Sequence, residues 1–383
     1  MDRRTFLEFL GKGVVMTAIS PSILSASNSF FHTFKGISPS DKDELKLAKG
    51  LSCDILIKWE DPISVQDTFG FNNDYTAFLP FDPAQPNDGI LWVNHEYVDP
   101  MFVSNYIDGE EKTKEQIQKE QYNVGGSIIR IKKTARGKWK VQENDPINKR
   151  ITGQTEIPFN WPQPIAGKNT AIGTLANCSG GITPWGTILT CEENYDMFYG
   201  ERNFKDGSLL EKPSILGWQK QFDNPPEHYG WVVEVDPKTG IAQKHIALGR
   251  CAHECATVKE LPDGRVVVYS GDDSMNECLY KFVGTKPGSL SEGKLYVANL
   301  RLGQWTSLNY DDNPVLQKKF KDQTEVLIRM REAAKLVGGT GLDRPEDIEI
   351  DPITGHVLVS LTCLLYTSPS PRDATLSRMP SSA

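Results

Sequence analysis

Side chains that could bind metal ions gather in five short stretches of the sequence, each at or just past the end of a β-type run. Carboxylates brought together repel one another unless cations neutralise them, so metal binding is the expected chemistry. The stretches are "WVNHEY" with Asn94, His95 and Glu96; "NCSGGITPWGTILTCEENY" with Cys178, Glu192 and Glu193; "GRCAHECATV" with His253 and Glu254; "YSGDDSMNE" with Asp272, Asp273 and Glu277; and "LDRPEDIEID" with Arg344, Glu346 and Asp347.

Cys178 decides which metals such a site would take. Oxygen ligands alone suit calcium or magnesium, whereas a thiolate among them favours a transition metal as well. The chain has seven cysteines, an odd number, so at least one is unpaired in a monomer. A free cysteine taken singly is more often a buried apolar residue than a ligand. The metal interpretation therefore requires that the five stretches converge.

The adjacent acids limit which side chains can face one site. Neighbouring residues on a strand point to opposite faces of the sheet, a limit that relaxes in loops past the strand ends. We expect Glu193 to face the metal and Glu192 to hold a supporting position. The same reasoning applies to Asp272 and Asp273.

The elements that must position these residues are short β-runs between Gly, Pro and Asp turns. Two segments, "VVEVDPKTG" and "IEIDPITGHVLVS", share the turn Asp-Pro-x-Thr-Gly, which is typical of hairpins. Recurrent hairpins over several hundred residues predict an all-β fold, a β-propeller whose loops converge on one face, with a pair of β-sandwiches as the alternative. The predicted runs are 89–93, 126–132, 186–190, 230–235, 265–270, 294–297 and 357–361, and the best helix is 324–336.

The two ends of the chain differ from its middle. Residues 1–26, with Arg3 and Arg4 before an apolar stretch, predict a signal peptide of the twin-arginine type, with an ordinary secretory signal or a retained anchor as the alternative. Residues 27–45 are expected to be a linker and 46–362 a partial propeller. Residues 363–383 resemble translated sequencing adapter, which would end the chain partway through its fold; a natural disordered tail is the other interpretation.

The charge of the chain argues against a nucleic acid partner. Its 383 residues include 42 basic and 50 acidic side chains, a formal net charge of −8. No long basic run interrupts this balance, so a phosphate-backbone binder is not expected.

Five segments in this order, "NHEY", "CSGGITPWGTILTCEEN", "AHE", "SGDD" and "RPEDIEI", are similar to the signatures of the PhoX family of secreted alkaline phosphatases. The resemblance runs from about residue 92 to 361. It implies a six-bladed propeller, here incomplete, that hydrolyses small phosphate monoesters with iron and calcium ions and a metal-bound oxygen nucleophile. The family also carries twin-arginine signals, so we expect export by the twin-arginine machinery to the periplasm or the outside of the cell. We also expect a monomer.

The resemblance also implies roles for single residues. Cys178 would be the thiolate ligand of iron, and Glu193, Glu254 and Glu346 carboxylate ligands of the cluster. Asp273, Glu96 and Asp347 would complete calcium coordination, and Arg344 would bind the phosphoryl oxygens as the catalytic residue.

One departure from the family pattern concerns Asn299. Family members often carry a basic residue after "LYVA", where this chain has Asn299, so one positive contact to phosphate is in doubt. Two other functions stay open: a calcium-dependent propeller hydrolase acting on lactones or phosphodiesters, and a non-catalytic propeller stabilised by calcium.

Overall fold

The computed structural model describes residues 36–211 and 214–362. The predicted signal peptide and the tail at 363–383 lie outside the described residues. The described residues fall into two units, 36–55 in the first and 56–211 with 214–362 in the second. In the described part of the first unit, residues 36–55 form no helix or strand. Across the described residues, none of the helices combines the length and the apolar character that a membrane span requires.

The second unit consists of antiparallel sheets with few parallel pairs. The first sheet has the order β1-β2-β3-β4, with β5 also on β3. The second has the order β7-β6-β13-β12-β9-β8, in which only the β6–β13 pair is parallel. Their strands are β1 Asn73–Pro80, β2 Asp88–His95, β3 Gly125–Lys133, β4 Trp139–Val141, β5 Lys149–Ile151, β6 Glu156–Asn160, β7 Thr170–Ile172, β8 Asn177–Ile182, β9 Ile188–Glu192, β12 Val232–Val235 and β13 Ala242–His245.

The third sheet has the order β14-β15-β17-β18-β19, and β21 and β22 form a two-stranded sheet. Two further short pairs are β10 with β11 and β16 with β20. The bounds are β10 Glu201–Arg202, β11 Leu209–Leu210, β14 Thr257–Glu260, β15 Val266–Gly271, β16 Met275–Glu277, β17 Leu279–Gly284, β18 Gly293–Asn299, β19 Gln304–Ser307, β20 Leu342–Asp343, β21 Pro345–Ile350 and β22 Val357–Leu361. Each β-run expected from the sequence is a strand.

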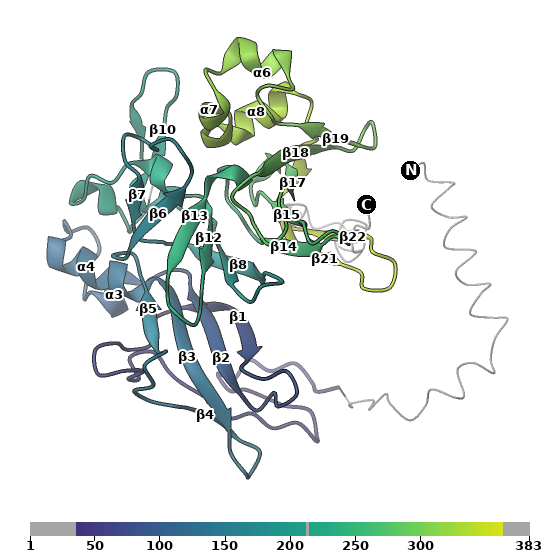
Figure 1. Cartoon of the computed structure of the whole chain (residues 1–383). Helices are drawn as coiled ribbons and strands as arrows, with labels where there is room; N and C mark the ends of the chain where they lie inside the picture. Colours follow the sequence, from purple (N-terminus) through teal and green to yellow (C-terminus); the bar gives the residue numbers. More distant parts are fainter. Residues whose placement is uncertain (1–35, 212–213, 363–383) are drawn as a thin grey trace, which may run out of the picture. The chain divides into compact units, whose positions relative to one another are not determined.

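The four main sheets are arranged as propeller blades. Their innermost strands contact one another in chain order, β1 with β8, β8 with β14, and β14 with β21. Figure 1 shows these sheets side by side around part of a circle that does not close. Because each innermost strand borders the same axis, residues far apart in sequence meet there.

The two Asp-Pro-x-Thr-Gly turns have the same geometry, as their shared sequence predicts. In the β12–β13 hairpin the Asp236 side chain accepts from Thr239 Oγ1, and Gly240 has a φ of 77°. In the β21–β22 hairpin Asp351 accepts from Thr354 Oγ1, and Gly355 has a φ of 70°. Glycine adopts this left-handed conformation without steric cost, so each hairpin closes at the same point.

The helices lie between strands and are short. They are α3 Pro100–Val103, α4 Lys114–Asn123, α5 Asp196–Tyr199, α6 Pro314–Lys319, α7 Gln323–Ile328 and α8 Met330–Leu336, with 3₁₀ turns η1 Trp218–Lys220, η2 Pro226–His228 and η3 Ile246–Leu248. The single helix expected over 324–336 is wrong, because the backbone leaves helical angles at Arg329 and separates α7 from α8.

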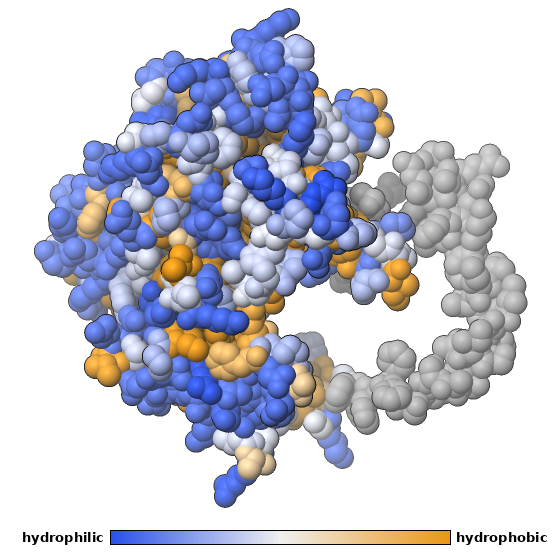
Figure 2. Space-filling view, in the orientation of Figure 1, coloured by the Kyte–Doolittle hydropathy of each residue, from blue (hydrophilic) through white to orange (hydrophobic). Residues whose placement is uncertain are grey.

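The core lies between neighbouring sheets. One cluster joins the second sheet, the third sheet and helices α6 to α8, and includes the fully buried Trp231, Tyr280 and Met330. A second cluster packs α4 and η1 around Trp218. Figure 2 shows a largely hydrophilic surface on the visible face, with hydrophobic residues gathered below its centre.

Candidate metal centre

Seven potential ligands form one continuous run at the inner strands. Three groups place one ligand atom from each member within 4.8 Å of the others, and they overlap through Cys178 and Glu254. The groups are Asp74, Glu96 and Cys178; Cys178, Glu193 and Glu254; and Glu254, Asp273 and Glu346. Six of the seven metal ligands expected from the sequence therefore lie together.

All four blades contribute to this run. Asp74 lies in β1 and Glu96 follows β2; Cys178 lies in β8 and Glu193 follows β9. Glu254 precedes β14 and Asp273 follows β15, while Glu346 is in β21. The ligands converge because each stands at the same end of a blade, as the sequence pattern requires.

Cys178 lies between two carboxyl groups. Its thiol donates to Glu254 Oε1 at 3.3 Å and lies 3.9 Å from Asp74 Oδ2. The Asn94 amide in turn donates to the backbone carbonyls of Cys178 and Ser179, at 2.6 and 3.1 Å. Asn94 is fully buried, so it joins the first two blades and holds the cysteine strand rather than serving as a ligand.

The two histidines beside the glutamates also point away from the ligand run. His95 Nδ1 contacts the Phe71 carbonyl oxygen at 3.0 Å, and Nε2 contacts Ser127 Oγ at 2.7 Å. His253 Nε2 contacts the Gly249 carbonyl at 2.8 Å, and Nδ1 contacts Ser270 Oγ at 2.7 Å. Burial lowers the pKa of His253 to about 4, so its ring is neutral. Both histidines anchor the backbone so that Glu96 and Glu254 face the cluster.

Of the two adjacent glutamates, Glu192 faces the interior of the blade. Its Oε1 lies 2.7 Å from Lys244 Nζ, and both side chains are fully buried. Its Oε2 accepts from the Trp231 backbone N–H. Glu193 belongs to the ligand run, which is the division expected from strand alternation.

The adjacent aspartates divide in the same way. Asp272 is fully buried and accepts two hydrogen bonds from Arg331 on α8. Asp273 belongs to the ligand run and accepts two from Arg344.

Burial, and then mutual repulsion, raises the pKa values of several groups in this run. Burial raises the pKa of Glu193 to about 10, and repulsion from Glu254 adds to the rise. Burial also raises the pKa of Glu254 to about 8 and that of Glu96 to about 7. The pKa of the Cys178 thiol is raised well above its ordinary range by burial and then by Glu254 and Glu193. Cations would reverse these shifts, because they favour the charged forms.

The donor set therefore fits several metal ions rather than one. Carboxylates are ligands for hard cations, and the single thiolate adds preference for a transition metal. Three of these acids, Glu193, Glu254 and Asp273, are buried, and buried carboxylates are tolerated only when their charge is compensated. Within the ligand run itself the donors are six carboxyl groups and one thiol.

Arg344 lies at the edge of this run. Its Nε and Nη2 atoms donate to Asp273 at 2.9 and 2.6 Å, and Nη2 lies 3.2 Å from Glu346 Oε1. The residue has a φ of 54°, in the left-handed region that is costly for an arginine and often found at functional sites. Its side chain is 33% exposed, so it can reach a ligand from solvent.

Two residues named in the sequence analysis lie outside the run. Asp347 is exposed and belongs to none of the three groups, although its charge helps to raise the pKa of Glu254. Asn299 ends β18, and its Oδ1 accepts from the Leu302 backbone N–H. No positive charge is supplied at that position.

Asp74 and Tyr97 also lie at this site, although the sequence did not predict them. Asp74 follows two asparagines at the start of β1. Its place at the start of a strand with alternating polar and apolar residues is the sequence feature that could have predicted it as a ligand. The Tyr97 hydroxyl is hydrogen-bonded to Asn194 and lies near Glu193 and Glu96. Burial raises the pKa of Tyr97 well above its ordinary range, so this hydroxyl keeps its proton.

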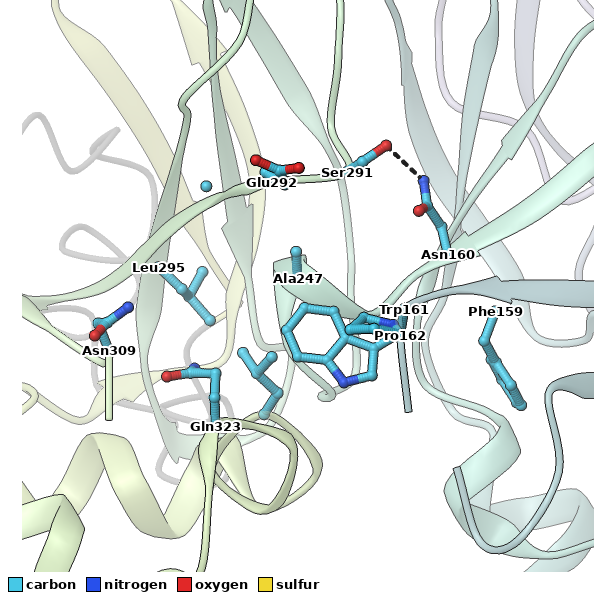
Figure 3. Close-up of a pocket in the computed structure, with 12 residues that line it drawn as sticks. Phe159, Asn160, Trp161, Pro162, Ala247, Ser291, Glu292, Leu295, Asn309 and Gln323 are labelled. Carbon is cyan, nitrogen blue, oxygen red and sulfur yellow. Dashed lines mark hydrogen bonds between the residues drawn. The ribbon is translucent and has the colours of Figure 1, made fainter. Parts of the chain in front are cut away.

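A cavity of about 660 Å³ lies elsewhere, between the end of β6 and the start of β18, and no ligand of the run lines it. Figure 3 shows Trp161 and Leu295 in its wall, with Asn160 donating to Ser291. The ligand run, and not this cavity, is the place where the potential metal ligands converge.

Comparison with known proteins gives a family for the chain. The family "Alkaline phosphatase PhoX" matches residues 32–373. Four solved chains match significantly. One of them is Pseudomonas fluorescens PhoX in complex with vanadate, a transition state analogue. Its TM-score is 0.75 at 31% identity, and the match covers 86% of this chain and 67% of that one. Among curated proteins, none matches significantly.

The similarity to the Pseudomonas fluorescens structure confirms the predicted all-β propeller, with sheets that do not close into a ring. The family match covers most of the chain and includes every residue of the ligand run. The chain therefore belongs to the PhoX family of alkaline phosphatases, enzymes that hydrolyse phosphate monoesters by a metal-dependent mechanism.

Proposed function

We propose that this chain hydrolyses small phosphate monoesters at a centre of iron and calcium ions held by the ligand run. The observation that carries the proposal is the overlap of three ligand groups through Cys178 and Glu254, directly beside Arg344. Phosphoryl transfer requires cations and donors around three charged oxygens, and this constellation offers both. The vanadate bound by the Pseudomonas fluorescens relative supports the same chemistry here.

The allocation of metals follows ligand chemistry and the family resemblance. Cys178 would bind iron, with Glu193, Glu254 and Glu346 as carboxylate ligands. Asp273, Glu96 and Asp347 would bind calcium, and Asp74 joins this set through its position beside Glu96 and Cys178. When bound, the ions supply positive charge to the phosphoryl oxygens and lower the pKa of water.

Arg344 would orient the phosphoryl group. Asp273 and Glu346 hold its Nε and Nη2 atoms, and among the described residues its Nη1 atom has no hydrogen-bond partner. A guanidinium held in this way presents free N–H groups in a constant direction, which suits a phosphoryl oxygen. Tyr97 would be a second donor, because its hydroxyl is protonated and lies near Glu193 and Glu96.

The cellular location of the enzyme and its export route are also part of the proposal. The twin-arginine signature at Arg3 and Arg4 favours export of the folded chain to the periplasm or the outside of the cell. Folding before export would let Cys178 acquire its metal in the reducing cytosol. We propose that the exported enzyme is a monomer. Fractionation of cells that express Arg3→Lys/Arg4→Lys beside the parent chain tests the route, and retention of the variant inside the cell is expected.

The decisive experiment combines elemental analysis with an aryl phosphate assay of the purified chain. We expect bound iron and calcium in the parent, and loss of both iron and turnover in Cys178→Ala and Glu254→Ala. Cys53→Ala is the matched control, because Cys53 is exposed and outside the run. Calcium without iron, with activity indifferent to Cys178, would favour a lactonase or phosphodiesterase instead. Absence of turnover above a metal-only blank would favour the non-catalytic propeller.

A further inference from the structure

Helix α8 places two basic side chains, one turn apart, on the loop that follows β15. Arg331 donates from Nε to Asp272 Oδ2 at 2.7 Å and from Nη2 to Asp272 Oδ1 at 2.6 Å. It also donates to Ser274 Oγ at 3.1 Å. Lys335 lies 3.1 Å from Glu277 Oε1 and donates to the Asn276 carbonyl. The helix therefore contacts both ends of the loop 272–277.

This loop carries one residue of the site and pairs with the segment that precedes another. Asp273 belongs to the ligand run. Strand β16 of the loop pairs with β20, with Met275 opposite Asp343. Arg344 follows β20 directly and returns to Asp273 through two hydrogen bonds. A displacement of the loop would consequently move both Asp273 and Arg344.

Asp272 is the point at which these contacts meet. Its carboxylate is fully buried, and it accepts from the Ala252 backbone N–H in addition to Arg331. The Asp273 backbone N–H donates to the Ala252 carbonyl. Ala252 lies two residues before Glu254, so the same carboxylate also holds the segment that carries this ligand. A buried carboxylate with several donors keeps its position only while all of them remain.

We propose that Arg331 is a positioning residue for phosphate recognition, acting through Asp272 and the loop 272–277 on Asp273 and Arg344. The inference rests on the proposed role of Arg344 at the phosphoryl group. Arg331 itself belongs to none of the three ligand groups, and its guanidinium is taken up by Asp272 and Ser274. The helical segment after β19 thereby supports the site from outside the sheet.

Arg329, at the junction between α7 and α8, offers a matched control. Arg329 forms ion pairs with Glu325 and Glu332, which lie on α7 and α8 and not on the loop. Its side chain is buried to a similar degree or more, with 12% exposure against 32% for Arg331. Replacement of Arg329 tests the helices without touching Asp272.

The test measures binding of inorganic phosphate by calorimetry, using the full chain with iron bound and calcium in excess. Arg331→Lys keeps the charge but removes the two-pronged contact. We expect it to weaken phosphate binding about tenfold, the order of coupling seen between contacting residues. Arg329→Lys is expected to bind like the parent. In the double variant Arg331→Lys/Arg344→Lys, binding should be less than tenfold weaker than in Arg344→Lys alone, because part of the effect of Arg331 passes through Arg344.

Three outcomes overturn the inference. Parent-like binding by Arg331→Lys would show that the contact does not position the site. Losses that multiply in the double variant would show a general structural role. If Arg344→Lys alone binds phosphate normally, the proposed role of Arg344 fails first, and the positioning role falls with it. Should Arg331→Lys not unfold cooperatively, the near-isosteric Asp272→Asn carries the same comparison, with the same tenfold loss expected.

Discussion

The pairs Glu192–Glu193 and Asp272–Asp273 occupy equivalent places in two neighbouring blades. In each pair the first acid, here called the inner acid, faces the protein interior, and the second, the outer acid, faces the ligand run. The two inner acids are held by different kinds of element. Glu192 is bound by Lys244 from β13 of its own sheet, and both side chains are fully buried. Asp272 is bound by Arg331 from helix α8 outside the sheet, and that arginine is 32% exposed. In both pairs the outer acid belongs to the ligand run.

The difference separates two ways of supporting a charged site. Glu193 depends on an ion pair inside a hydrogen-bonded sheet, where any movement would disrupt the ladder between β9 and β12. Asp273 depends on a loop held by a helix, which can shift without breaking a main sheet. We infer that the first pair determines stability and that the second adjusts the position of Arg344.

The largest expected effect is the loss of phosphatase activity when an outer acid, Glu193, is replaced. Glu193→Gln should lower phosphatase activity by about 10² to 10³, the size typical of losing one electrostatic contribution at a site. The metal-free variant should be at least as stable as the parent above pH 7, because it has no carboxyl to ionise there. Activity assays and urea unfolding measure both quantities. Glu260→Gln, at the exposed end of β14, is the control, and normal activity in Glu193→Gln would contradict the proposed ligand role.

The next effect is a loss of stability when the ion pair between Lys244 and Glu192 in the second sheet is broken. Lys244→Met leaves the Glu192 carboxylate buried without its cation, which should cost about 3 to 5 kcal/mol of unfolding free energy. Urea unfolding measures this loss, and Glu192→Gln combined with Lys244→Met should recover part of it. Lys132→Met, which removes an exposed ion pair with Asp88, should cost less than about 1 kcal/mol. Equal losses for the two lysines would contradict the comparison.

A smaller loss of unfolding free energy is expected when Arg331 of helix α8, the partner of Asp272, is replaced. Arg331→Met should lower the unfolding free energy by about 1 to 3 kcal/mol, because solvent can reach the arginine side and relieve the remaining charge. Its loss of phosphate affinity should exceed that of Lys244→Met. If Arg331→Met destabilises the protein more than Lys244→Met does, the inference that the Glu192–Lys244 pair is the one that determines stability is wrong.

The remaining prediction is a pH dependence of the metal-free protein, spread over three groups and several pH units. Glu96, Glu254 and Glu193 have pKa values raised to about 7, 8 and 10, from an ordinary value of 4.5. The folded state therefore holds protons that the unfolded state releases, and stability falls as pH rises from about 5 toward 10. Each group contributes at most about 1.4 kcal/mol per pH unit. Thermal unfolding in chelator between pH 5 and 9 measures the slope, which Glu193→Gln should reduce.

Several features were predictable from the sequence because they depend on local patterns. Alternation at the end of β9 predicted different surroundings for Glu192 and Glu193, and the two side chains do differ: Glu192 pairs with Lys244, while Glu193 lies in the ligand run. The Asp-Pro-x-Thr-Gly turns were predictable because Pro and Gly restrict the backbone directly. The single helix at 324–336 was wrong, since the break at Arg329 leaves no mark in the hydrophobic spacing. Helix α4 was missed because "KEQIQKEQYN" contains little apolar surface, although Thr113 and Gln116 form a capping box.

By itself the sequence determined the type of candidate ligands, their order along the chain and their places at the ends of strands. The tertiary structure alone decided that Asp74 joins them, that Asn94 holds Cys178, and that Arg331 reaches Asp272 across 59 positions. The reason is physical: turns and strand faces depend on neighbours in the chain. A contact between blades depends instead on how buried sheets pack, and no local spacing records that packing.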